Sequence, residues 1–217
     1  MIAQIDGDIL AYKAGFSAQR TRYRFIYNGG SRIDYDDLTL LQIKKDLLCR
    51  GLSHNDGKLQ KLIYPEPVAF ALQRVKLLID MIMDNTGATS YNMYLTANDK
   101  SNFRFKLATI KEYKGNRKDM KRPMHYDAIR EYLVSYHDAE MIYGQEADDA
   151  MGIAQMRSPT DSIICSIDKD LDMIPGYHYN MDTKEHYTAA DPGTVFLDDY
   201  RRKVHGRGLL WFYAQML

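Results

Sequence analysis

The amino-acid sequence predicts an α/β protein with a mostly parallel central sheet and helices on both faces. Short apolar, β-branched runs alternate along the chain with segments whose apolar residues recur at helical spacing. The clearest run, Ile163–Ile167, suits a strand buried on both faces. It leads directly into Asp168, and a carboxylate at the end of a buried strand needs a cationic partner. In open α/β sheets, the carboxyl ends of the strands are where ligands bind.

The other strands follow from local signals. Three more central strands are expected, at Ile2–Ile5, Tyr91–Thr96 and Glu140–Tyr143. Asn28-Gly29-Gly30 is a turn signal that predicts a hairpin of Arg22–Ile26 with Ser31–Tyr35. Gly51–Gly57 is expected to be a loop. A short second hairpin is expected to join His178–Met181 to Lys184–Tyr187.

Helices are predicted between these strands. The longest prediction, Glu66–Asn85, has apolar residues at helical spacing and ends near Gly87. Pro123 suits the first turn of another helix. The full set of predicted helices is Ile9–Phe16, Asp36–Cys49, Glu66–Asn85, Pro123–His137, Gln145–Met156, Asp198–Lys203 and Leu209–Leu217.

Length and composition indicate one globular domain over residues 1–217. Hydrophobic residues make up 45 % of the chain, which is enough for a packed core. Two cysteines, Cys49 and Cys165, provide no disulfide framework, as is typical of a reducing compartment. The first residues lack the basic and apolar pattern of a signal peptide, and no window is apolar enough to span a membrane. The sequence therefore predicts a cytoplasmic protein with no membrane partner.

The net charge of zero conceals a strongly basic segment. Residues 100–122 contain nine Lys and Arg residues against two acids, a net charge of +7 that the rest of the chain balances. Such a run is often only a solvated helix face. Here Phe103, Phe105 and Tyr113 are interleaved with the cations, a pattern that favours contact with single-stranded nucleic acid.

Acidic residues gather where the predicted strands end and one helix begins. Asp6, Asp99 and Asp168 follow three strands, and Glu146-Ala147-Asp148-Asp149 opens a helix. Taken singly, such acids are common as turn, cap or first-turn residues, and Asp8 and Asp172 are interpreted in this way. In a parallel sheet, however, seven would converge and repel one another unless cations bind: Asp6, Asp99, Glu146, Asp148, Asp149, Asp168 and Asp170. Oxygen ligands without a His or Cys cluster favour Mg²⁺ or Mn²⁺ over zinc, with room for up to two ions.

These motifs resemble the 5′→3′ exonuclease and flap endonuclease family, above all its bacteriophage members. The resemblance rests on the order and spacing of short motifs from residue 1 to about 190. They are Ile5-Asp6-Gly7-Asp8, Asp99 with Asn102-Phe103-Arg104, Tyr113-Lys114-Gly115-Asn116-Arg117-Lys118, Gln145-Glu146-Ala147-Asp148-Asp149 and Ser166-Ile167-Asp168-Lys169-Asp170.

The resemblance implies a PIN-like nuclease that uses two Mg²⁺ ions to cut DNA, or RNA–DNA hybrids, at 5′ ends or flaps. Asp6, Asp99, Glu146, Asp148 and Asp149 correspond to the first metal cluster, and Asp168 and Asp170 to the shared and second positions. Residues 104–137 correspond to a basic helical arch over the 5′ strand, in which Lys114 and Arg117 are the catalytic cations. The residues expected to contact nucleic acid are Arg104, Lys106, Lys111, Tyr113, Lys114, Arg117, Lys118, Lys121 and Arg122.

In the family, the acids that complete the second metal site and a helix–hairpin–helix follow the region that Trp211–Leu217 resembles, and this sequence does not contain them. Either the sequence is a fragment, or a separate polypeptide or replication partner supplies that part, or the site works differently. Weak or absent occupancy of the second metal position is therefore expected. Two alternatives stay open. The chain could be a non-catalytic nucleic-acid-binding module. It could also be a haloacid-dehalogenase-like phosphatase, with Asp6 as nucleophile and Asp8 as general acid.

Overall fold

The computed structural model describes residues 1–53, 55–99, 101–107, 121–190, 192–198 and 203–216. Its centre is a six-stranded sheet built from β1 (Ile2–Asp6), β5 (Ser90–Thr96), β6 (Glu140–Ile142), β7 (Ser162–Ser166), β8 (Gly176–Asn180) and β9 (His186–Ala189). The strand order is β6-β5-β1-β7-β8-β9. All neighbouring pairs are parallel except β8 with β9. The sheet is therefore mixed but mostly parallel, which confirms the predicted fold class.

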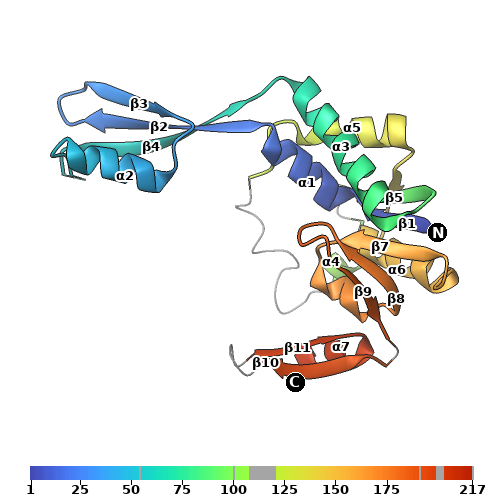
Figure 1. The fold of residues 1–217 in the computed structure, drawn as a ribbon. Coiled ribbons are helices and arrows are strands. Elements are labelled where there is room, and N and C mark those ends of the chain that lie inside the picture. Colours follow the sequence, from blue (N-terminus) through green and yellow to red (C-terminus); the bar gives the residue numbers. More distant parts are fainter. Residues whose placement is uncertain (54, 100, 108–120, 191, 199–202, 217) are drawn as a thin grey trace.

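Helices cover both faces of this sheet (Figure 1). One face packs against α1 (Gly7–Ser17), α3 (Val68–Thr86) and α5 (Tyr126–His137), and the other against α6 (Ala147–Arg157). Strand side chains alternate between the two faces. Ile163 and Cys165 of β7 belong to the first core, whereas Ile164 between them belongs to the second. This alternation explains why the run reads as continuously apolar.

Most predicted boundaries lie within a few residues of the observed ones. The long predicted helix corresponds to α3 and ends at Gly87, whose left-handed backbone (φ 63°) closes the helix as glycine readily does. The predicted helix from Asp36 begins later, as α2 (Leu40–Cys49), because Thr39 forms a capping box with Gln42. The hairpin around Asp182 is confirmed as β8 and β9.

Residues 19–65 form an antiparallel extension, here called the arm, that projects from the end of α1 (Figure 1). Its strands, in the order β3-β2-β4, are β2 (Gln19–Tyr27), β3 (Arg32–Asp36) and β4 (Gly57–Pro65). Helix α2 covers one face through a small core of Phe25, Tyr35, Ile43 and Leu47. The predicted hairpin is confirmed, but β4 was not predicted, since its pairing with β2 reaches across α2 in the sequence.

The last elements are a hairpin of β10 (Thr194–Asp198) with β11 (Lys203–Arg207), followed by α7 (Leu209–Met216). The helix predicted at Asp198–Lys203 is wrong at both ends, because Asp198 ends β10 and Lys203 begins β11. The part of the predicted helix between them, 199–202, lies outside the described residues, and the strands on either side pair with each other. Among the described residues, no helix has the length and apolar character needed to cross a bilayer.

Candidate metal centre

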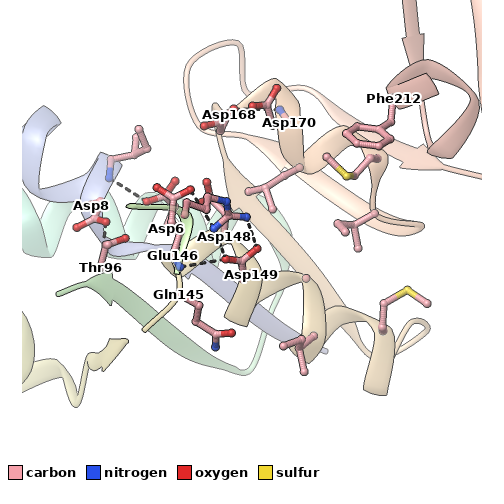
Figure 2. Close-up of a pocket in the computed structure, with 18 of the residues that line it drawn as sticks. Asp6, Asp8, Thr96, Gln145, Glu146, Asp148, Asp149, Asp168, Asp170 and Phe212 are labelled. Atoms are coloured by element: carbon pink, nitrogen blue, oxygen red, sulfur yellow. Dashed lines mark hydrogen bonds and ion pairs between the residues drawn. The ribbon is translucent and has the colours of Figure 1, made fainter. Parts of the chain in front are cut away.

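A hollow at the carboxyl edge of the sheet collects most of the predicted acids. Strand β1 lies between β5 and β7, so its end is central, and α1 and α6 begin beside it. Figure 2 shows most of the side chains that line the hollow, with Asp168 and Asp170 in the segment that follows β7. Seven carboxylates contribute: Asp6, Asp8, Glu146, Asp148, Asp149, Asp168 and Asp170.

Asp6 is the innermost of these acids and ends β1. Its side chain caps α1 by accepting the Ile9 backbone N–H at 3.0 Å, and its second oxygen accepts the Ser166 hydroxyl at 2.8 Å. Only 3 % of the residue is exposed. Burial raises the pKa of Asp6 to about 6, although both hydrogen bonds favour the ionised form.

Ser166, the last residue of β7, joins two walls of the hollow. Its oxygen donates to Asp6 and accepts the backbone N–H of Asp168 at 3.1 Å. Asp168 in turn caps the 3₁₀ helix η2 (Lys169–Met173) by accepting the Asp170 N–H at 3.0 Å. The Asp170 side chain is exposed. Ser166 was part of a recognised motif, but the sequence offered no signal for this bridging role.

Among the acids of this edge, Asp148 has the most strongly raised pKa. It lies in the first turn of α6, and within the described residues it forms neither a hydrogen bond nor an ion pair. Burial, followed by the charges of Asp6 and Asp168, raises the pKa of Asp148 to about 8. Among the described residues, therefore, no group compensates the negative charge that Asp148 carries when it is ionised.

Arg104 compensates a different part of the edge. Both of its terminal nitrogens donate to Asp149, at 2.7 and 2.8 Å, and one lies 3.4 Å from Glu146. This pairing lowers the pKa of Asp149. Glu146 and Asp149 also form the capping box of α6. They therefore stabilise the start of this helix, and this role does not prevent them from lying near a bound cation as well. Arg104 was predicted to contact nucleic acid, and here it lies in the hollow.

Asp8 belongs to the site, although the sequence indicated only a turn or cap residue. One oxygen accepts the Thr96 N–H at 3.0 Å, and the other forms an ion pair with Arg130. Arg130 is 4 % exposed and also donates to the Thr96 carbonyl at 2.6 Å. The two side chains tie the start of α1 to the end of β5. Because they are 122 residues apart, no local pattern could reveal the pair.

The remaining predicted residues are distributed differently. Asp99 is exposed, bonds to Ser101 at 2.6 Å and does not line the hollow, because the chain turns away after β5. Lys106 lies in the short helix α4 (Arg104–Leu107). Lys121 is exposed, and Arg122 donates to Asn98 at 3.3 Å. The other predicted cations and the aromatic residue lie outside the described residues: Lys111, Tyr113, Lys114, Arg117 and Lys118.

The donor atoms of this edge are of the type that hard divalent cations prefer. They are all oxygen atoms, and the raised pKa values of Asp6 and Asp148 reflect anionic charge that a cation would relieve. Among the described residues, no three acidic, His or Cys side chains form a ready-made ligand group. Mg²⁺ characteristically keeps several waters and binds one or two carboxylates directly, so it needs no finished protein cage.

No protein-family model matches the chain, and neither curated proteins nor solved structures gave a significant match. The class that the structure itself defines is an α/β protein with a mostly parallel sheet and an acidic hollow at its carboxyl edge.

Asp148 makes the stability of the metal-free protein depend on pH. Its pKa of about 8 in the folded state exceeds the ordinary 3.8, so its stabilising contribution is complete below about pH 4 and is lost as the pH rises through 8. In EDTA, urea unfolding of the wild type should therefore show a free energy of unfolding that falls between about pH 5 and 8. Asp148→Asn should flatten this profile and be more stable at pH 8, by on the order of a few kcal/mol. Mg²⁺ should restore wild-type stability at pH 8. Parallel profiles for the two proteins would contradict the assignment.

Proposed function

We propose that the protein is a divalent-metal-dependent 5′ nuclease that hydrolyses phosphodiester bonds of DNA, or of RNA–DNA hybrids, at 5′ ends or flaps. The observation that carries the proposal is the buried, uncompensated acidic edge around Asp6 and Asp148. Arg104, which belongs to the strongly basic segment of residues 100–122, lies at this edge. An anionic substrate and an acidic hollow are compatible only if cations mediate between them.

In this proposal, Asp6, Asp148, Asp168 and Asp170 would hold up to two Mg²⁺ ions. Bound Mg²⁺ would lower the pKa of a coordinated water and stabilise negative charge on the leaving oxygen. Ser166 keeps Asp6 and Asp168 at a fixed spacing through its two hydrogen bonds. Arg104 offsets part of the negative charge of Asp149 and Glu146, which lowers the repulsion that the hollow presents to a phosphate.

The finer assignments of the proposal rest on resemblance. They are the PIN-like fold, the arch of residues 104–137 and the roles of Lys114 and Arg117 as phosphate-contacting catalytic cations. Helix α5, which forms the last part of that range, packs on α1 and α3, so it can anchor the preceding basic residues to the helices that cover the central sheet. A role in primer removal or strand degradation follows from the same resemblance.

The test is cleavage of a 5′-flap duplex by the purified chain. Cleavage is expected with Mg²⁺ or Mn²⁺ and not in EDTA, with products that carry a 5′-phosphate and a 3′-hydroxyl. Salt-dependent nucleic-acid binding without cleavage, even in Mn²⁺, would instead support the non-catalytic module.

The phosphatase alternative is less compatible with the geometry. A nucleophilic carboxylate must reach the phosphorus atom of the substrate directly, whereas a small cation can still bind a hydrogen-bonded carboxylate through a remaining lone pair. Both Asp6 oxygens accept hydrogen bonds and the residue is almost fully buried, while Asp8 is held by Arg130 and Thr96. A phosphorylated Asp6 trapped from a phosphomonoester would nevertheless reverse this preference.

A further inference from the structure

The face of the arm that α2 does not cover carries a row of cations. Paired strands place residues directly opposite one another on the same face, and Phe25 of β2 points toward α2. Its alternate neighbours therefore point the other way, and we call this side the open face. Its cations are Arg20, Arg22 and Arg24 of β2, Arg32 of β3 and Lys58 of β4.

The charge of the arm is positive overall. Residues 19–65 contain nine Lys and Arg residues against five acids, a net charge of +4. Near the body, Arg20, Arg22 and Arg24 form ion pairs with Glu66, Asp36 and Asp34. At the far end the situation differs. Arg32 and Lys58 lie opposite Ile26 on either side, are exposed, and form no ion pair with any residue that the structure describes.

The root of the arm adjoins the end of the basic segment. The His125 ring bonds to the Glu66 carbonyl at 2.6 Å, and Glu66 closes the base of the arm by donating to the Ala18 carbonyl at 2.8 Å. Pro123 packs so closely on the last turn of α1 that a Cβ on Gly15 would lie 2.6 Å from it. Lys121 and Arg122 therefore lie next to the root of the arm. Arg104, near the other end of the basic segment, lies in the acidic hollow.

We propose that the open face of the arm binds the phosphate backbone of duplex DNA, the double-stranded part of the substrate. The inference rests on the nucleic-acid substrate of the proposed function and adds the surface that holds its duplex. Nine residues of β2 extend about 30 Å at roughly 3.3 Å per residue. This length is close to one turn of B-DNA, roughly 34 Å. The open face carries cations along this length, and Arg32 and Lys58 at its far end form no ion pair within the described residues, so this end is suited to contact with the phosphate backbone.

Single-stranded DNA fits this face less well. Proteins that bind single strands stack the bases on exposed aromatic side chains. Tyr64 is the aromatic residue that the paired strands place on the open face, and the Arg22 guanidinium lies over its ring, 5.2 Å from the centroid. The other tyrosines of β2 and β3, Tyr23, Tyr27 and Tyr35, belong to the core under α2. Phosphate contact without base stacking favours the duplex.

The arm offers a matched control for testing this surface. Arg32→Gln/Lys58→Gln removes two exposed cations from the open face, and Lys44→Gln/Lys45→Gln removes two exposed cations from α2 on the other side. Neither pair belongs to the candidate metal centre. Binding of a blunt duplex and of a single strand of matched length is measured by fluorescence anisotropy, in EDTA, from about 50 to 200 mM salt.

The open-face variant should bind the duplex several-fold to about tenfold more weakly, with a salt slope smaller by about two, and bind the single strand as the wild type does. The α2 variant should match the wild type on both probes. The proposal is overturned if the two variants lose duplex affinity equally, if neither loses it, or if duplex and single strand weaken together. The binding measurement is made in EDTA, so it can be interpreted even if the protein shows no nuclease activity. Conversely, if the open-face variant and the wild type bind the duplex with equal affinity, this proposal fails but the nuclease proposal does not.

Discussion

Replacing Asp168 by alanine is expected to abolish cleavage of a 5′-flap substrate while nucleic-acid binding is retained. Asp168 is one of the carboxylates proposed to hold Mg²⁺, and its charge contributes to the raised pKa of both Asp6 and Asp148. Loss of this carboxylate should weaken cation binding and lower the single-turnover rate on the order of a thousandfold, about 4 kcal/mol of activation free energy. The rate is measured in saturating Mg²⁺, and binding separately in EDTA.

The matched control lies at the opposite end of the same strand. Asp161 is an exposed aspartate just before β7, so Asp161→Ala removes an equal charge far from the carboxyl edge. This variant should cleave as the wild type does. Unchanged cleavage by Asp168→Ala would refute the proposed role of the acidic edge. A parallel loss in both variants would point to net charge rather than to a metal ligand.

Replacing Arg130 by methionine is expected to produce the largest loss of stability of any single change at the site. The guanidinium is buried and joins Asp8, the Thr96 carbonyl and the Tyr126 hydroxyl. Methionine fills part of the volume but leaves the Asp8 carboxylate without its cation. Breaking one partner of a buried ion pair typically costs about 3–5 kcal/mol, and urea unfolding should show a loss of that size.

A surface ion pair provides the comparison for Arg130. Arg24 forms a bidentate pair with Asp34 on the arm, and Arg24→Met should lower stability far less, because exposed pairs contribute little. Combining Arg130→Met with Asp8→Asn should recover part of the loss, since the uncompensated charge is then gone. Additive losses in the double variant would show that Asp8 and Arg130 are not coupled.

The central sheet was predictable from the sequence because its signals are local. Ile163–Ile167 reads as a buried strand on its own, and the side chains that follow such strands fall at one edge whatever the details of packing. Asp6 and Asp168 were placed correctly for that reason. The same argument failed for Asp99, three residues beyond β5, because Ala97 bonds to the Ile142 carbonyl and the chain then turns outward.

The parts that could not be predicted depend on pairing between distant residues. Strand β4 reads Lys58-Leu59-Gln60-Lys61-Leu62, a repeat of three residues that does not match the two-residue period of a strand, and only its pairing with β2 places Leu59 against Phe25. Asp8 was interpreted from the sequence as a first-turn residue, and it does lie in the first turn of α1. Its ion pair with Arg130 could not be predicted, because the two residues meet only in the folded protein. The raised pKa of Asp148 is likewise a consequence of assembly, because burial is its main cause and the charges that add to it, on Asp6 and Asp168, come from distant parts of the chain.

The most direct test of the central claim, that this edge holds divalent cations, is a crystal structure in saturating Mn²⁺ with anomalous data. The account predicts one strong anomalous peak within coordinating distance of the Asp6, Asp148 or Asp168 carboxylates, at about 2.0–2.2 Å directly or about 4 Å through water. A weaker peak is expected on the Asp170 side. Absence of any peak at this edge, or Mn²⁺ bound only elsewhere on the protein, would contradict the account.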